Sequence, residues 1–132
     1  MIEICELNLE IFTDMIVEKL QEIDGLEVIL DNPQADSKFP CASISTPLKS
    51  VINTENGIPT RVNLSVSVSY WTNSKHSSMK LSDNADIKLR ELNLTRVNSP
   101  IDSYDEITRK YRYGGSYEVF FNGLTNSLER RR

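Results

Sequence analysis

The sequence has little of the residues that most often carry chemistry. Its 132 residues include two cysteines, far apart at Cys5 and Cys41, and one histidine, His76. These are too few and too scattered to indicate a four-ligand zinc site, and unpaired thiols are typical of a reducing compartment. A glycine-rich phosphate loop, a Gly-x-Ser-x-Gly elbow and a His-x-x-x-His pair are all absent. We therefore expect no metal, no cofactor and no catalytic residues.

Long hydrophobic runs are also absent. No apolar run approaches the roughly 18 residues that a membrane span needs, and the first residues, MIEICE, are acidic, unlike a secretory signal. We expect no membrane association and a protein that stays in the compartment where it is made. The length suits one domain, 1–132, with a core over about 7–122 and a basic C-terminal tail, 123–132.

Charge is unevenly distributed. The net charge is −4, but residues 1–60 carry eleven acids and three bases, whereas residues 61–132 carry eight acids and twelve bases. Two interpretations fit this pattern. The charged residues are ordinary solvent-exposed residues, or the molecule has two oppositely charged surfaces that contact each other between neighbouring copies. The overall acidity argues against a dedicated nucleic-acid binder.

The first half of the chain predicts a helix and then strands. Asn8 is a typical N-cap, an apolar stripe at helical spacing follows, and Gly25 is the expected C′ residue, so we expect a helix over 8–23. Short strands are expected at 26–30 and 40–48. The stripe consists of Leu9, Phe12, Ile16, Leu20 and Ile23.

A long hairpin arm is expected at about 45–65. Asn56-Gly57 is a strong signal for a two-residue loop, which would place Glu55 opposite Ile58, Ile52 opposite Arg61 and Val51 opposite Val62. Its outer part, 49–60, has too few large apolar residues to form a hydrophobic core of its own, so we expect it either to fray or to lie against a partner. The strand that follows, NLSVSVSYWT, alternates strictly, and its serine side must face water or another subunit.

The second half predicts another helix and three strands. The helix begins at Ser74, Ser77 or Ser78, and a strand follows at 94–97 and a polar loop at 98–105. A last hairpin pairs 107–113 with 117–121 around a three-residue loop, Gly114-Gly115-Ser116. We expect an α+β fold, order α-β-β-β-α-β-β-β, with a mostly antiparallel sheet and two helices on one face. The helix stripe is Met79, Leu81, Ala85, Leu89 and Leu92.

The order of these elements resembles a known family. The segments that carry the resemblance are FPCASIS at 39–45, VSYWT at 68–72, LRELN at 89–93 and TRKYRYGGSYEV at 108–119. Over about 7–122 the chain is similar to the small tail-completion and head–tail joining proteins of long-tailed bacteriophages, most of all the tail terminators. The resemblance rests on order and spacing.

The resemblance implies a structural virion protein and no enzyme. Tail terminators form a hexameric ring that caps the tail tube, stops its polymerisation and joins the tail to the head connector. The implied partners are further copies, tail tube protein, sheath protein in contractile tails, and connector proteins, with DNA passing through the lumen without specific binding. Assembly takes place in the bacterial cytoplasm. The expected interface comprises Val51, Ile52, Asn53, Thr54, Glu55, Asn56, Gly57, Ile58, Asn98, Ser99, Asp102 and Tyr104.

Three alternatives stay open at the level of sequence. The first is a neck or head-completion adaptor on the portal side of the junction. The second is a small hydrolase that uses Cys41 or His76. The third is a nucleic-acid-binding module that uses Arg109, Lys110, Arg112 and the Arg130–Arg132 tail for charge, with Tyr111 or Tyr113 for stacking.

Overall fold

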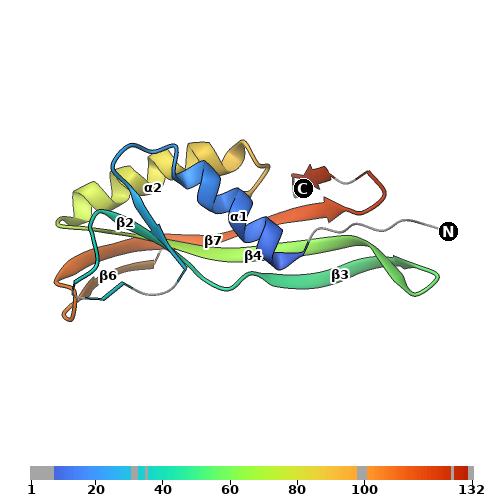
Figure 1. Ribbon diagram of the computed structural model, residues 1–132, viewed down its shortest axis with the longest axis horizontal. Coiled ribbons are helices and arrows are strands. Elements are labelled where there is room, and N and C mark those ends of the chain that lie inside the picture. The colour runs from blue at the N-terminus through green and yellow to red at the C-terminus, as the bar shows by residue number, and fades with distance from the viewer. Residues whose placement is uncertain (1–7, 31–32, 35, 98–100, 126, 131–132) are drawn as a thin grey trace.

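The fold is α+β, as expected, and the described residues form two helices and one mixed, mostly antiparallel sheet of eight strands (Figure 1). The computed structural model describes residues 8–30, 33–34, 36–97, 101–125 and 127–130. The observed order, α-β-β-β-β-α-β-β-β-β, has one more strand in each half than predicted. The elements are α1 Leu9–Leu20, β1 Glu27–Ile29, β2 Cys41–Ile44, β3 Leu48–Glu55, β4 Ile58–Thr72, α2 Lys75–Arg90, β5 Thr95–Arg96, β6 Ile101–Asp105, β7 Lys110–Asn122 and β8 Ser127–Glu129.

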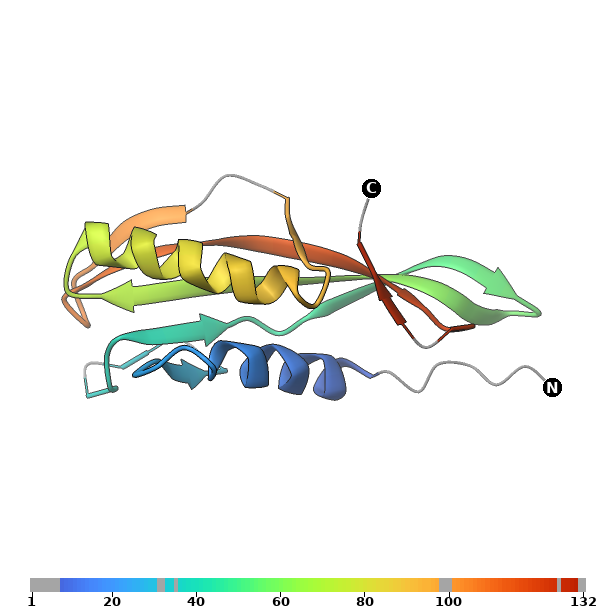
Figure 2. The ribbon, with the colours of Figure 1, turned by 90° about the horizontal axis from the view of Figure 1, so that it is seen from above.

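Strands β4 and β7 form the spine of the sheet. They pair without interruption from Arg61 opposite Asn122 to Thr72 opposite Tyr111. Strands β2 and β3 both pair with the other side of β4, and β1 runs parallel to β2. The far side of β7 pairs in turn with β6, β5 and β8. Both helices cover one face of this sheet, as Figures 1 and 2 show.

The strict alternation in β4 explains the two faces. Its apolar residues, from Val62 to Tyr70, are buried in the core beneath the helices. From α1 the core receives Phe12, Ile16 and Leu20, which are fully buried. The serines of β4 therefore lie on the opposite face of the sheet, since successive side chains of a strand point to opposite sides.

Helix α1 begins where predicted but ends earlier. The Asn8 side chain accepts a hydrogen bond from the backbone N–H of Ile11 at 2.8 Å, as an N-cap does. The helix ends at Leu20, with Gln21 as C-cap, so the predicted end at residue 23 was wrong. Gly25 does have a positive φ of 78°, but it lies in the turn before β1 and is not the C′ residue.

Helix α2 presents small residues to the sheet. Ser74 is its N-cap, one of the three candidates, and the buried positions are Ser78, Ser82, Ala85 and Leu89. The prediction that Met79 is buried was wrong, since this side chain is 40% exposed. The predicted stripe consisted mainly of large apolar residues. The helix instead faces the sheet with mostly small residues, which allow the two to lie close together.

The predicted hairpin around Gly114-Gly115 was wrong. Strand β7 runs straight through both glycines, and the predicted pairing of Tyr113 with Tyr117 does not exist. A Cβ built on Gly114 would lie 2.3 Å from the carbonyl oxygen of Val68, so the glycine allows close approach of β7 to β4 and makes no turn. The turn lies instead at 106–109, where Arg109 has a φ of 56°, and part of the predicted loop 98–105 is β6.

The arm hairpin closes as predicted. Asn56 and Gly57 have φ values of 54° and 78°, as a type I′ turn requires, and Glu55 lies opposite Ile58. Val51 lies opposite Val62, also as predicted. The pairing of Ile52 with Arg61 was wrong, because an irregularity in the ladder shifts the register and brings Asn53 opposite Arg61. Within the predicted C-terminal tail, residues 127–129 pair with β7 as β8.

Candidate interaction surfaces

The β3–β4 hairpin projects beyond both helices as a two-stranded arm (Figure 2). Every residue of β3 is exposed, and none of them belongs to the core. Two large apolar side chains, Val51 and Ile52, are 51% and 44% exposed. The outer part of the predicted interface, residues 51–57, is therefore accessible along its whole length.

The outer edge of β3 is open. Among the described residues this strand pairs only with β4, so one side of its backbone has no strand beside it. An exposed edge of this length is a template on which another strand can add. Lys49 is its one basic residue and Glu55 its one acidic residue, so charge does little to block such pairing.

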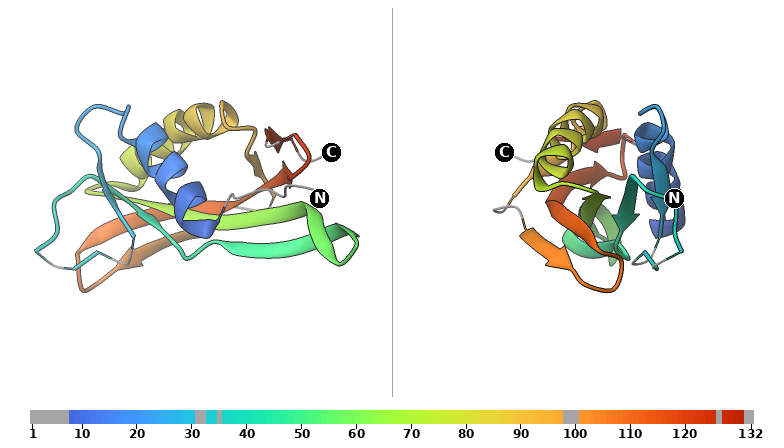
Figure 3. Two further views of the ribbon diagram at one scale, coloured as in Figure 1. Left: turned by 45° about the vertical axis from the view of Figure 1, so that its right-hand side comes forward. Right: turned by 90° about the vertical axis from the view of Figure 1, so that its left-hand side faces the viewer.

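Ile58 begins β4 at the arm tip, opposite Glu55, and the remaining predicted residues lie elsewhere. Asn98 and Ser99 lie outside the described residues. Asp102, on β6, makes a 2.8 Å ion pair with Lys75 at the start of α2, and Tyr104 packs edge-on against Tyr111 at 5.0 Å between ring centres. Figures 1 and 3 place β6 at the end of the molecule opposite the arm tip. The structure thus divides the predicted residues between two distant surfaces.

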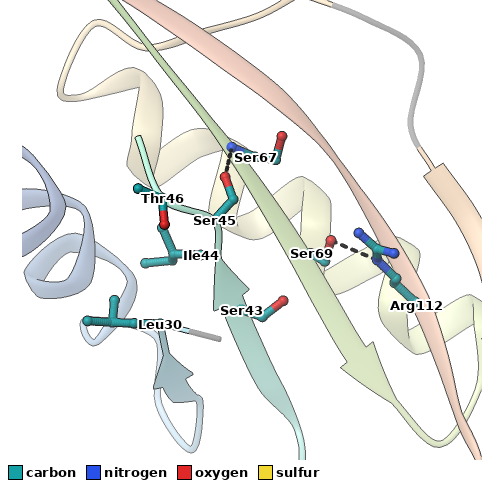
Figure 4. Close-up of a pocket in the computed structure, with 8 residues that line it drawn as sticks. All are labelled: Leu30, Ser43, Ile44, Ser45, Thr46, Ser67, Ser69 and Arg112. Atoms are coloured by element: carbon teal, nitrogen blue, oxygen red, sulfur yellow. Dashed lines mark hydrogen bonds between the residues drawn. The ribbon is translucent and has the colours of Figure 1, made fainter. Parts of the chain in front are cut away.

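A polar pocket lies on the sheet face away from the helices, at the base of the arm (Figure 4). It has a volume of about 210 Å³, and Arg112 is the only charged residue among the described residues that line it. The other lining residues are Leu30, Ser43, Ile44, Ser45, Thr46, Ser67 and Ser69. The serine alternation was visible in the sequence, but the position of Arg112 beside it was not, because the pairing predicted for β7 was wrong.

Cys41 and His76, the two residues considered for a hydrolase, do not form an activated nucleophile in the structure. Cys41 is fully buried on β2, and burial raises the pKa of its thiol to about 12, which opposes formation of the thiolate. His76 is exposed in the first turn of α2. Groups of three or more metal-ligating side chains are absent from the described part of the chain.

The aromatic and basic residues of β7 lie on opposite faces. Tyr113 lies opposite Tyr70, whose side chain is buried in the core, whereas Arg112 lies opposite Trp71 on the other face. The guanidinium of Arg112 covers the Trp71 ring at 5.5 Å, and its Nε donates to the Ser69 hydroxyl at 3.0 Å. Tyr113 and Arg112, two of the residues considered for stacking and for phosphate binding, thus face opposite sides of the sheet.

A scan against protein-family models finds no matching family, and a search of curated proteins finds no matching sequence. Neither described helix is long and apolar enough to cross a membrane.

Proposed function

We propose that this protein is a tail terminator, a structural protein of a phage virion. Six copies form a ring that caps the tail tube, stops its polymerisation and joins it to the head connector, with DNA passing through the lumen. The proposal combines the family resemblance of the sequence with the projecting arm. The single observation that carries it is the open, fully exposed edge of β3.

The arm supports the proposal because its free edge offers unpaired backbone N–H and C=O groups to a strand of a neighbouring copy. Eight residues of β3 extend ~26 Å at ~3.3 Å per residue, which is enough to cross onto a neighbouring copy. Pairing with a neighbour's strand satisfies the backbone groups of that edge and covers Val51 and Ile52. An isolated two-stranded hairpin is at best marginally stable, so docking also stabilises the arm itself.

The positions of the two surfaces also support a ring. The arm tip and β6 lie at opposite ends of the molecule (Figure 1). A contact that joins two different surfaces of identical copies generates a closed ring when its rotation closes.

Tube growth in the presence of the purified protein tests the proposal. Tail tube protein from the same phage is allowed to polymerise, and tube lengths are measured by electron microscopy with the wild-type protein and with a variant lacking residues 52–58. That deletion leaves Val51 opposite Val62 across a three-residue loop, so the rest of the sheet keeps its register. The wild-type protein should shorten the tubes and bind their ends, whereas the deletion variant should do neither.

Two outcomes would favour another function over that of a tail terminator. Tubes of unchanged length, with the protein bound to purified connector or portal instead, would favour the neck adaptor. Salt-dependent binding to single-stranded DNA, without any effect on tubes, would favour the nucleic-acid module.

A further inference from the structure

The polar pocket at the base of the arm presents hydrogen-bond donors (Figure 4). Ser43 accepts a hydrogen bond from the indole N–H of Trp71 at 3.0 Å, and Ser69 accepts one from Nε of Arg112 at 3.0 Å. Indole and guanidinium groups donate only, so each serine oxygen acts as an acceptor and its own hydrogen stays available. Ser43 is 7% exposed and Ser69 is 4% exposed.

Ser45 and Arg112 provide further hydrogen-bond donors at the pocket. The Ser45 hydroxyl accepts a hydrogen bond from the backbone N–H of Ser67 at 2.9 Å, so its hydrogen is also free to donate. The two terminal nitrogens of Arg112 have no hydrogen-bond partner among the described residues. Three hydroxyl hydrogens and one guanidinium fork therefore border one cavity of about 210 Å³.

Among the described residues, no acidic side chain lines the pocket to satisfy these donors. Asp105 feels the charge of Arg112, but its carboxylate accepts hydrogen bonds from the Thr108 hydroxyl and N–H at 2.6 and 3.1 Å. A single guanidinium with neighbouring hydroxyls matches one planar, singly charged carboxylate, which accepts two parallel N–H donors. A phosphate dianion would leave one negative charge uncompensated.

We propose that this pocket binds a carboxylate and that Glu55 of a neighbouring copy supplies it. This inference rests on the proposed ring. Glu55 is the only charged residue within 50–60, it is exposed at the tip of the arm, and no hydrogen bond or ion pair holds it within the described chain. Because Thr46 lines the pocket and lies nine residues before Glu55, the two are ~30 Å apart along the strand at ~3.3 Å per residue. A copy therefore cannot fill its own pocket.

The first experiment tests the pocket on the protein alone. Sodium acetate is titrated into isotopically labelled protein, with sodium chloride at equal ionic strength as the control. Acetate should give saturable NMR shifts at the amides of Ser43 and Ser69 and at the Nε–H of Arg112, and Arg112→Gln should abolish them. Sodium phosphate should give weaker shifts at the same signals. Identical responses to acetate and chloride would overturn the carboxylate site.

The second experiment tests the source of the carboxylate by exchanging charges. Ring formation is followed by sedimentation velocity, either alone or with tail tubes if the ring forms only on tubes. Glu55→Gln and Arg112→Glu should each weaken assembly by roughly tenfold or more, and the double variant Glu55→Arg, Arg112→Glu should restore much of it. Glu18→Gln, an exposed acid on α1 and away from both the arm and β6, is the matched control and should assemble normally.

The outcomes separate this inference from the proposed function. Normal rings from Glu55→Gln, together with acetate binding, would overturn Glu55 as the occupant while leaving the ring intact. Acetate binding by a wild-type protein that assembles neither alone nor on tubes would overturn the ring and, with it, the neighbour's Glu55. Glu55→Gln changes only an exposed tip, so misfolding does not account for a loss of assembly in that variant.

Discussion

Replacing Gly114 by alanine tests the continuous β4–β7 spine. A methyl group at this position would lie 2.3 Å from the carbonyl oxygen of Val68 and 2.7 Å from Cα of Ser69. Both are backbone atoms of β4, so neither moves aside without shifting the central strand. At Gly115, by contrast, the nearest atom is Nε of Arg96 at 2.9 Å, in a flexible side chain that has room to rearrange.

The two substitutions should therefore differ in cost. Forcing an extra methyl group into a packed site typically costs 1–3 kcal/mol, and the backbone contact at Gly114 places it at the upper end, ~3 kcal/mol. The lower entropy of the unfolded alanine chain returns about 0.4–1 kcal/mol. We expect Gly114→Ala to destabilise the protein by roughly 2–3 kcal/mol, and Gly115→Ala by less than about 1 kcal/mol.

Urea unfolding followed by far-UV circular dichroism measures both values. The expected loss for Gly114→Ala corresponds to a fall in Tm of roughly 6–10 °C for a domain of this size. Equal stabilities for the two variants, within about 0.5 kcal/mol, would refute the close approach of β7 to β4 at Gly114. They would instead favour the exposed hairpin loop that the sequence suggests.

Three further substitutions or conditions test local features of the fold. Ser78→Ala removes the 2.7 Å hydrogen bond with the buried Thr72 hydroxyl, and urea unfolding should show a loss of ~1–2 kcal/mol. The pKa of Cys41, raised to about 12 by burial, keeps its thiol protonated, so peptide mass spectrometry should find it unmodified by iodoacetamide at pH 8 until the protein unfolds. Hydrogen bonds from Thr108 lower the pKa of Asp105. Their stabilisation is present above the unfolded pKa of about 3.9 and is lost as pH falls through the lower folded value, so Thr108→Val should flatten the acid limb of a pH–stability curve.

Local turn and cap chemistry was readable from the sequence. Asn56-Gly57 specifies a type I′ turn whatever surrounds it, because both residues tolerate positive φ. Asn8 and Ser74 cap their helices for an equally local reason, since each side chain satisfies an orphan N–H three residues later. The alternation of β4 likewise fixed which of its residues enter the core.

Features that depend on contacts between residues far apart in the sequence could not be predicted from the sequence. Gly114-Gly115 is compatible with either a turn or a close approach of two paired strands. The sequence does not show that the backbone of β4 lies against Gly114, which is what distinguishes the two. The pocket could not be predicted from the incorrect hairpin, because Arg112 contacts Ser69 only when β7 pairs with β4 along its whole length. The predicted interface residues were chosen along the chain, so their division between two ends of the molecule had no sequence signal.

The mass of the assembly that the protein forms tests the central claim most directly. It is measured by mass photometry or native mass spectrometry for the protein alone and for purified tail tubes incubated with it. We expect six copies of the 15.1 kDa chain, free in solution or added at a tube end. Single copies in solution together with no mass gained at tube ends would contradict it.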